Sequence, residues 1–253
     1  MTNSEITNAY LGTDQVQKIY LGSDVIWPTT HDYSKDYLTI EALESGTFYA
    51  RNFNGQYNKN GEGWTLKAGT IEFNLAQGDK IEFRANINRG ITGLFSGNTM
   101  SFEVYGNIES MEYGSNFSGK TTIRNASAFT GYFVSSTGLA DASNLILPAT
   151  TLKATCYYRM FSGCSNIEKA PELPAPTLLN NSYKEMFQNC TSLNYIKCLA
   201  TSKTTDSTTY WVNGVQTTSG TFIKDPSSGA GAGYFWGIGI GGIPENWTIV
   251  NAT

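Results

Sequence analysis

The sequence is poor in the residues on which most chemistry depends. Among its 253 residues there is one histidine, and Lys, Arg, Asp and Glu together make up 15%, against roughly 25% in an average soluble protein. The 17 basic residues form no cluster, and the net charge is −4. Without a basic surface patch the chain cannot neutralise the phosphates of a nucleic acid, so we expect no nucleic acid partner. No apolar run approaches the roughly 18 residues of a membrane helix, so we expect no membrane insertion.

Cysteine is scarce and widely spaced. The four cysteines are Cys156, Cys164, Cys190 and Cys198, and none forms a C-x-x-C pair. A zinc site needs closely spaced Cys or His ligands, so we expect no metal. Two interpretations of the cysteines stay open. They are either small buried side chains stacked in a ladder, or they form a disulfide across the repeats described below.

The usual catalytic pairs are missing as well. His31 lies alone in a polar linker, so no Ser-His or Cys-His pair is in prospect and we expect no catalytic residue. Glu103, Glu109 and Glu112 lie close in sequence, which leaves a carboxylate pair for glycoside hydrolysis open beside the reading as surface charges. The glycines of 237–242 match G-x-G-x-x-G by spacing, but no helix can follow them, so we expect no dinucleotide or other cofactor.

The main positive feature is a segment that occurs twice. It spans 147–172 and is followed without a gap by a second copy at 173–198, which starts 26 residues later. A fixed period in the twenties is typical of leucine-rich-type repeats that stack into a solenoid. The matched pairs are Leu147/Leu173, Pro148/Pro174, Leu152/Leu178, Tyr157/Tyr183, Met160/Met186, Phe161/Phe187 and Cys164/Cys190.

Each coil of this array is expected to contain a short helix, a tight turn and a short strand. The helix is predicted from the apolar spacing in CYYRMFSGC and SYKEMFQNC. The repeated Met-Phe pair is expected in the core, since stacking requires identical buried residues. A weaker copy spans 133–145, and residues 105–145 are expected to form the entry coils. After residue 200 a Thr-rich segment is expected to cap the array.

The region before the repeats alternates in the manner of strands. Runs such as YLTIEAL and DKIEFRA are bounded by Gly, Asn and Asp, and Asn60-Gly61 is a strong hairpin turn signal. We therefore expect a mainly β chain with three parts: an N-terminal hairpin element (1–30), a small antiparallel β-sandwich (31–104) and a short leucine-rich-repeat solenoid with a C-terminal β cap (105–253).

A second, shorter repeat lies at the N-terminus. AYLGTDQVQK is followed by IYLGSDVIWP, and each unit is predicted to form strand, turn and strand. A lone hairpin of this size is marginal in water, so it either folds onto the next domain or anchors the chain in an assembly. The candidate anchor residues are Tyr10, Leu11, Tyr20, Leu21 and Trp27.

A glycine-rich loop near the C-terminus carries three consecutive aromatic residues. It is either a closing loop whose aromatics pack onto the last coil, or an adaptable contact surface for a glycan or a protein. Two aromatic residues upstream are candidates for the same surface. The candidate ligand contacts are Tyr210, Trp211, Tyr234, Phe235 and Trp236.

The repeats resemble the BspA-like leucine-rich repeats that are abundant in surface proteins of gut Bacteroidales and in phages of those bacteria. The resemblance rests on LPATTL, CYY, MF, GC and PELPA in the first copy and on GIP and WT near the C-terminus. The segment 37–86 is similar to the β domain that accompanies these repeats. The doublet YLGTDQVQKIYLGSDVIW is similar to short leaders of phage tail and fibre proteins, and the first ten residues lack the features of a secretory signal.

The resemblance implies adhesion to cells or surface glycans, with no catalytic residues. The leading hypothesis is a non-enzymatic virion structural protein of a bacteriophage, either a head or tail fibre or an exposed decoration. It would be assembled in the host cytoplasm, join other virion proteins through its N-terminal segment as a dimer or trimer, and bind a host surface glycan or protein from the virion surface. The alternative is a leucine-rich-repeat adhesin on the surface of a gut Bacteroidales cell.

Overall fold

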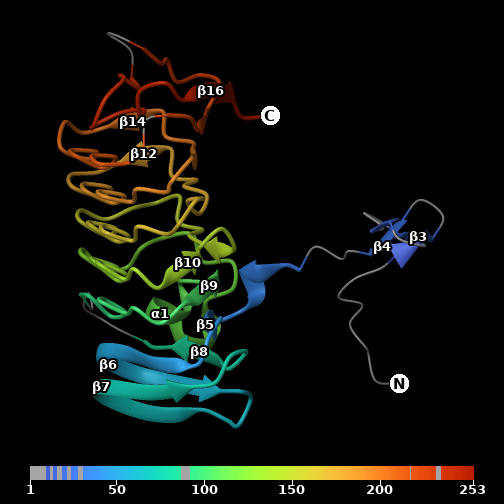
Figure 1. The fold of residues 1–253 in the computed structure, drawn as a ribbon. Helices are drawn as coiled ribbons and strands as arrows, with labels where there is room; N and C mark the ends of the chain where they lie inside the picture. Colours follow the sequence, from blue (N-terminus) through green and yellow to red (C-terminus); the bar gives the residue numbers. More distant parts are fainter. Residues whose placement is uncertain are drawn as a thin grey trace. The chain divides into compact units, whose positions relative to one another are not determined.

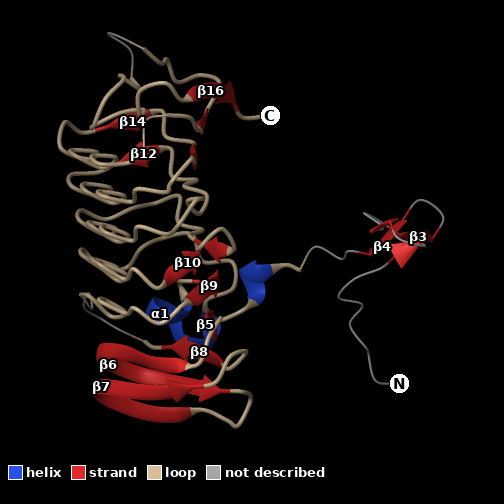
Figure 2. Ribbon diagram, in the orientation of Figure 1, coloured by secondary structure: helices blue, strands red, loops and turns tan. Residues whose placement is uncertain are grey.

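The computed structural model contains two compact units, Met1–Asp32 and Tyr33–Thr253. The prediction of a mainly β chain is confirmed, with 33% strand and 5% helix. The second unit is the body of the protein (Figures 1 and 2). The described residues are 10–11, 14–15, 19–21 and 24–27 by backbone alone, and 31–86, 92–216, 218–231 and 235–253.

The first unit contains two short antiparallel hairpins. β1 (Tyr10–Leu11) pairs with β2 (Asp14–Gln15), and β3 (Ile19–Leu21) pairs with β4 (Asp24–Trp27). The paired strands follow the two copies of the repeated sequence. The side chains of all five candidate anchor residues lie outside the described part of the chain.

The body begins with a mixed seven-stranded sheet in the order β10-β9-β5-β8-β6-β7, with β11 also on β9. All pairs from β5 to β9 are antiparallel, whereas β10 and β11 lie parallel to β9. Asn60 and Gly61 have φ of 51° and 76°, as the predicted turn requires. The strands are β5 (Leu38–Ala42), β6 (Gly46–Lys59), β7 (Thr65–Leu75), β8 (Lys80–Arg84), β9 (Phe102–Asn107), β10 (Leu139–Asp141) and β11 (Leu145–Ile146).

This sheet differs from the predicted β-sandwich. The strands expected to form two facing sheets pair instead in one sheet, and β10 and β11, which lie just before the first repeat copy, extend it along β9. The boundary expected at residue 104 lies inside β9. One hydrophobic core runs from Leu38 to Trp247, so the body has no break between sheet and repeats.

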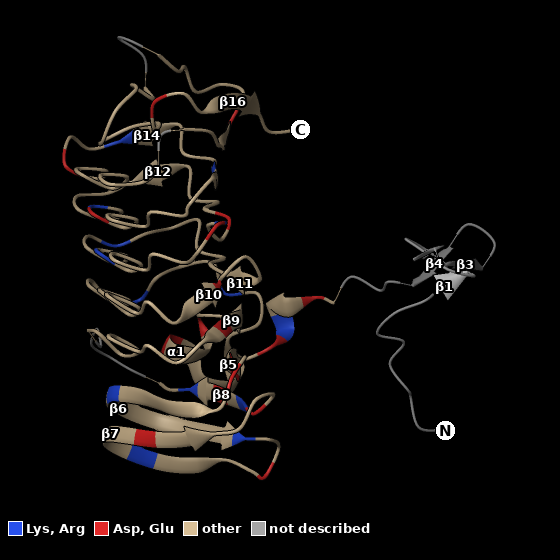
Figure 3. Ribbon diagram, in the orientation of Figure 1, with Lys and Arg blue, Asp and Glu red and all other residues tan. Residues whose placement is uncertain are grey.

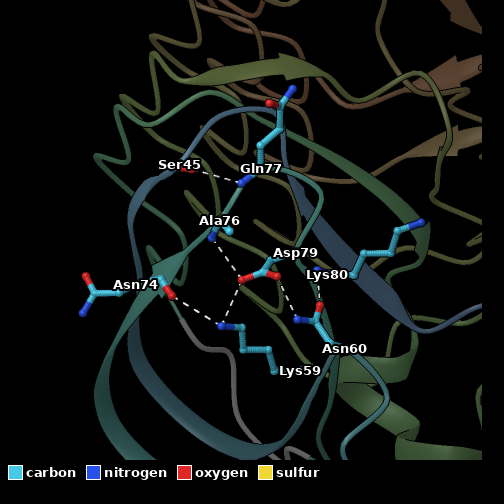
Figure 4. A network of polar contacts seen from close by, with 8 residues as sticks. All are labelled: Ser45, Lys59, Asn60, Asn74, Ala76, Gln77, Asp79 and Lys80. Atoms are coloured by element: carbon cyan, nitrogen blue, oxygen red, sulfur yellow. Dashed lines mark hydrogen bonds and ion pairs between the residues drawn. The ribbon is translucent and has the colours of Figure 1, made fainter.

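A network of exposed polar groups joins two turns of the sheet (Figure 4). The Asp79 carboxylate accepts hydrogen bonds from Asn60 Nδ2 (2.8 Å) and from the Ala76 amide (3.0 Å) and forms an ion pair with Lys59 (3.0 Å). Asn60 Oδ1 in turn accepts from the Lys80 amide at 2.8 Å. These bonds hold the β6–β7 turn against the β7–β8 turn.

Above the sheet the chain forms stacked layers of turns, which among the described residues lie at 92–98, 127–136, 155–164, 181–190 and 207–215 (Figure 1). In the layer at 155–164 the amides of Tyr157 and Phe161 donate to the carbonyls of Ser182 and Met186 in the next layer, at 3.0 and 2.9 Å. The Met160 amide instead donates to the Tyr157 carbonyl within its own layer, at 3.2 Å. Alternate amides thus bond within a layer and between layers, which satisfies the buried backbone.

These turns replace the helix that was predicted in each repeat. A residue with positive φ occurs at every fourth position, for example Thr155 (63°), Arg159 (56°) and Gly163 (78°). A right-handed helix cannot pass through such positions. The helices of the body, among its described residues, are η1 (Tyr33–Lys35), α1 (Ser110–Tyr113) and η2 (Gly114–Asn116). Apolar residues four apart fit a chain of four-residue turns as well as a helix, which explains the wrong prediction.

The repeated residues form the core of the stack, as predicted for the Met-Phe pairs. The ring of Phe161 lies 5.4 Å from that of Phe133 and 5.6 Å from that of Phe187, with interplanar angles of 3° and 7°. All four cysteines are buried and free, so no disulfide joins the layers. Cys164 and Cys190 donate to carbonyls of the preceding layer, at 2.9 and 3.0 Å.

Parallel strand pairs also join the layers of the stack. β13 (Tyr195–Cys198), β15 (Thr221–Lys224) and β16 (Thr248–Asn251) form a three-stranded parallel sheet. β12 (Thr177–Leu178) pairs in parallel with β14 (Ser202–Lys203). Most connections between layers are loops in Figure 2, and their pairing is parallel because each layer repeats the path of the one before it.

Candidate binding site at the cap of the stack

The last layer is covered by the segment 236–243, at the end of the body farthest from β6 and β7 (Figure 1). Three contacts fix this cap. Trp211 Nε1 donates to the Gly242 carbonyl at 2.6 Å, Thr208 Oγ1 donates to the Gly241 carbonyl at 2.8 Å, and the Val212 amide donates to the Ile240 carbonyl at 3.3 Å. Within the cap, Gly242 allows a close backbone approach, since a Cβ at this position would lie 1.8 Å from the Gly237 carbonyl oxygen.

Two of the candidate ligand contacts belong to the core. Trp211 and Trp236 have no exposed surface, and their rings stack at 5.4 Å with an angle of 19°. Trp211 also stacks on Tyr183 of the layer beneath, at 6.4 Å. Side chains without accessible surface cannot contact a ligand in this conformation. The two tryptophans therefore close the aromatic stack, and the prediction that they form a contact surface is corrected.

The remaining candidates lie around the cap. Tyr210 is 47% exposed and has a φ of 56°. Phe235 is half-buried and packs edge-on against Trp236, with ring centroids 4.9 Å apart. Tyr234 lies outside the described residues. Of the five predicted contacts, the structure thus gives Tyr210 an accessible ring and Phe235 a partly accessible one.

Lys203 joins these aromatic residues and was not singled out from the sequence. Its Nζ lies 4.8 Å from the ring centroid of Trp236 and 5.0 Å from that of Phe235, and it donates to Thr208 Oγ1 at 3.3 Å. Burial lowers the pKa of the Lys203 ammonium. Within the described part of the chain no carboxylate forms an ion pair with it. The one sequence signal is that Lys203 stands alone as the basic residue of a Thr-rich stretch.

Lys203, Thr208 and Tyr210 line an open cavity of about 280 Å³. Its walls combine one ammonium, three threonine hydroxyl groups and the exposed side chains of Tyr210 and Ile240. Ile240 is 49% exposed. Such a mixture can hold an anionic group at the lysine and an apolar face against the ring. The lining residues are Lys203, Thr205, Thr208, Thr209, Tyr210, Ile240 and Gly241.

The acidic residues considered for glycoside hydrolysis do not form an accessible pair. Glu109 has no exposed surface and Glu112 has 3%. Burial, and then the nearby Glu112 carboxylate, raise the pKa of Glu109 to about 9, and neither of its oxygens has a hydrogen-bond partner. Glu112 instead accepts hydrogen bonds from the Arg124 and Asn125 amides, at 2.7 and 3.1 Å. Burial also raises the pKa of the half-buried Glu103. Neither Glu109 nor Glu112 can reach a substrate in this conformation.

Lys, Arg, Asp and Glu are scattered along the ribbon of the body, with blue and red segments in many of its layers (Figure 3). In the described ranges there is no group of three or more His, Cys, Asp or Glu that could hold a metal ion. No helix found in those ranges is long and apolar enough to cross a membrane. No family model, curated protein or solved structure matches the chain.

Proposed function

We propose that the chain is a non-enzymatic virion structural protein of a bacteriophage, a head or tail fibre or an exposed decoration, that mediates adhesion to host surface or gut glycans or proteins. The observation that carries this proposal is the division of the chain into a short unit made of a repeated hairpin and a body with one continuous core. Such a division favours separate attachment and display.

In this proposal the body is a short BspA-like leucine-rich-repeat solenoid whose turns replace the usual helices. The repeated residues support it, because they lie buried in register between layers. In a stack of this kind, the exposed positions that differ between copies are the ones free to serve recognition. Its cap supplies an open cavity and an exposed ring for contact with a ligand.

The N-terminal hairpins are proposed to join other virion proteins and to oligomerise as a dimer or trimer. Isolated hairpins of two to four residues per strand are marginal in water. Pairing with strands of a neighbouring chain would supply the contacts that a short hairpin lacks.

A surface adhesin of a gut Bacteroidales cell is the second candidate, because the same repeats would serve display on a cell. Mass spectrometry of density-purified phage particles separates the two. The proposal predicts peptides of the body at a constant ratio to the capsid protein. Recovery of those peptides only from bacterial envelopes would favour the adhesin and contradict the virion protein.

A further inference from the structure

We propose that the cavity at the cap binds a carboxylate-bearing sugar residue, such as a uronic acid, with Lys203 as the partner of the carboxylate. The inference rests on the proposed adhesive function and names the ligand class of its site. It is carried by an ammonium without an ion-pair partner and hydroxyl groups without hydrogen-bond partners among the described residues, and by an exposed ring, all around one cavity.

The charge of Lys203 is the first argument. A partly buried ammonium loses hydration and is normally compensated by a carboxylate. Among the described residues its partners are two aromatic rings and the hydroxyl of Thr208, and burial lowers its pKa. An anion in the cavity would supply the missing countercharge through a charge-assisted hydrogen bond.

The hydroxyl groups are the second argument. Thr208 Oγ1 is already engaged, since it donates to Gly241 and accepts from Lys203, so it fixes the ammonium. The hydroxyls of Thr205 and Thr209 line the same cavity and have no hydrogen-bond partner among the residues that the structure describes. Hydroxyl groups both donate and accept, which suits the hydroxyls of a sugar.

Size and the apolar wall are the third argument. The cavity of about 280 Å³ is close to the lower end of small-molecule sites, about 300 Å³, and so suits a single sugar ring. Tyr210 and Ile240 are 47% and 49% exposed at its edge. An accessible aromatic ring offers an apolar surface for the C–H face of a sugar at low entropic cost.

Calorimetric titration of the full chain with glucuronic acid, glucose and inorganic sulfate tests the inference. We expect glucuronic acid to bind at least about tenfold more tightly than either of the others, because only it satisfies both the ammonium and the ring. Lys203→Met should weaken glucuronic acid binding at least about tenfold. Lys120→Met is the control, since Lys120 also lies over a ring, that of Tyr113 at 5.5 Å, but outside the cavity.

Two further variants keep the test decisive if Lys203→Met unfolds. Thr205→Val keeps the shape and removes a hydroxyl, and Tyr210→Asn removes the ring while tolerating the positive φ. Each should weaken binding of glucuronic acid. No binding by the wild type, equal binding of glucose, or equal binding of sulfate would overturn the inference. None of these results depends on whether the chain is found in phage particles. Calorimetry therefore tests the ligand, and mass spectrometry of particles tests the proposed function independently.

Discussion

At the scale of single residues, the layers depend on backbone conformations that most side chains avoid. Positive φ values occur at Thr155, Arg159, Asn181, Glu185, Asn189 and Tyr210. The left-handed region costs an ordinary residue about 1–2 kcal/mol, and branched side chains suffer most. Interlayer hydrogen bonds such as Arg159 N to Lys184 O (3.0 Å) hold these residues in place.

Thr155→Gly should therefore stabilise the protein by roughly 0.5–1 kcal/mol, because relief of the left-handed strain exceeds the entropy that glycine loses on folding. Urea denaturation measures this difference. Thr151→Gly, at a position without positive φ, should lower stability instead. A loss of stability in both variants would show that the layers do not impose the strain.

Glu109 should make stability depend on pH. Its folded pKa of about 9 lies above the ordinary value of 4.5, so folding favours the protonated carboxyl. The contribution is complete below about pH 4.5 and is lost as pH rises toward 9, by up to about 1.4 kcal/mol per pH unit. Glu109→Gln should remove this slope, and urea denaturation at several pH values measures it.

Glu62→Gln provides the control, since Glu62 is exposed in the β6–β7 turn. The free energy of unfolding of Glu62→Gln should change with pH in the same way as that of the wild type. The difference between wild type and Glu109→Gln isolates Glu109 from the other buried carboxyls. If stability changed with pH equally in the wild type and in Glu109→Gln, the result would contradict the burial of an unpartnered carboxyl.

At the scale of elements, the turns of the sheet depend on side-chain hydrogen bonds. The bond from Asn60 is the main cause that lowers the pKa of Asp79 to about 2 from 3.8. This lowering stabilises the fold above about pH 4, and the contribution is lost as pH falls toward 2. Asn60→Gly keeps the backbone turn and should raise the Asp79 pKa toward its ordinary value.

Carboxyl-carbon NMR titration measures that pKa directly. Asn52→Gly is a matched control, because Asn52 also has a positive φ, 53°, and contributes nothing to the network of Figure 4. In Asn52→Gly the pKa of Asp79 should stay near 2. An unchanged pKa in Asn60→Gly would mean that the two turns are not joined as described.

The aromatic stack is the element that joins the layers. Phe161 is fully buried between Phe133 and Phe187, so Phe161→Ala should cost about 3–5 kcal/mol in the free energy of unfolding. Leu66→Ala, at a side chain 73% exposed, should change it by less than about 0.5 kcal/mol. Thermal or urea unfolding compares the two, and similar small losses would argue against a shared core.

The sequence predicted the elements unevenly for physical reasons. The identities of Met160, Phe161 and their copies predicted the buried register, because stacking demands the same residue at each level. The turns were mistaken for helices, since their period of four is close to 3.6. The pairing of β9 with β10 was missed, because alternation predicts a strand but not its partner. Lys203 was missed because its cavity is assembled from 203–210 and 240–241.

At the scale of the whole molecule, the body is a stack of layers, and the apolar face of the layer at each end must be covered. The seven-stranded sheet covers one end, and the cap with Trp236 covers the other (Figure 1). Between them the core is continuous, so we expect the body to unfold as one cooperative unit. Because the N-terminal unit has its own contacts, its removal should leave that transition unchanged.

Deletion of residues 1–30 tests the central claim most directly, by measuring how much of the body enters phage particles. We predict that the truncated chain keeps the circular dichroism spectrum and thermal midpoint of the full chain but is absent from purified particles by immunoblot. Incorporation at the wild-type level would contradict an anchoring role for the N-terminal hairpins.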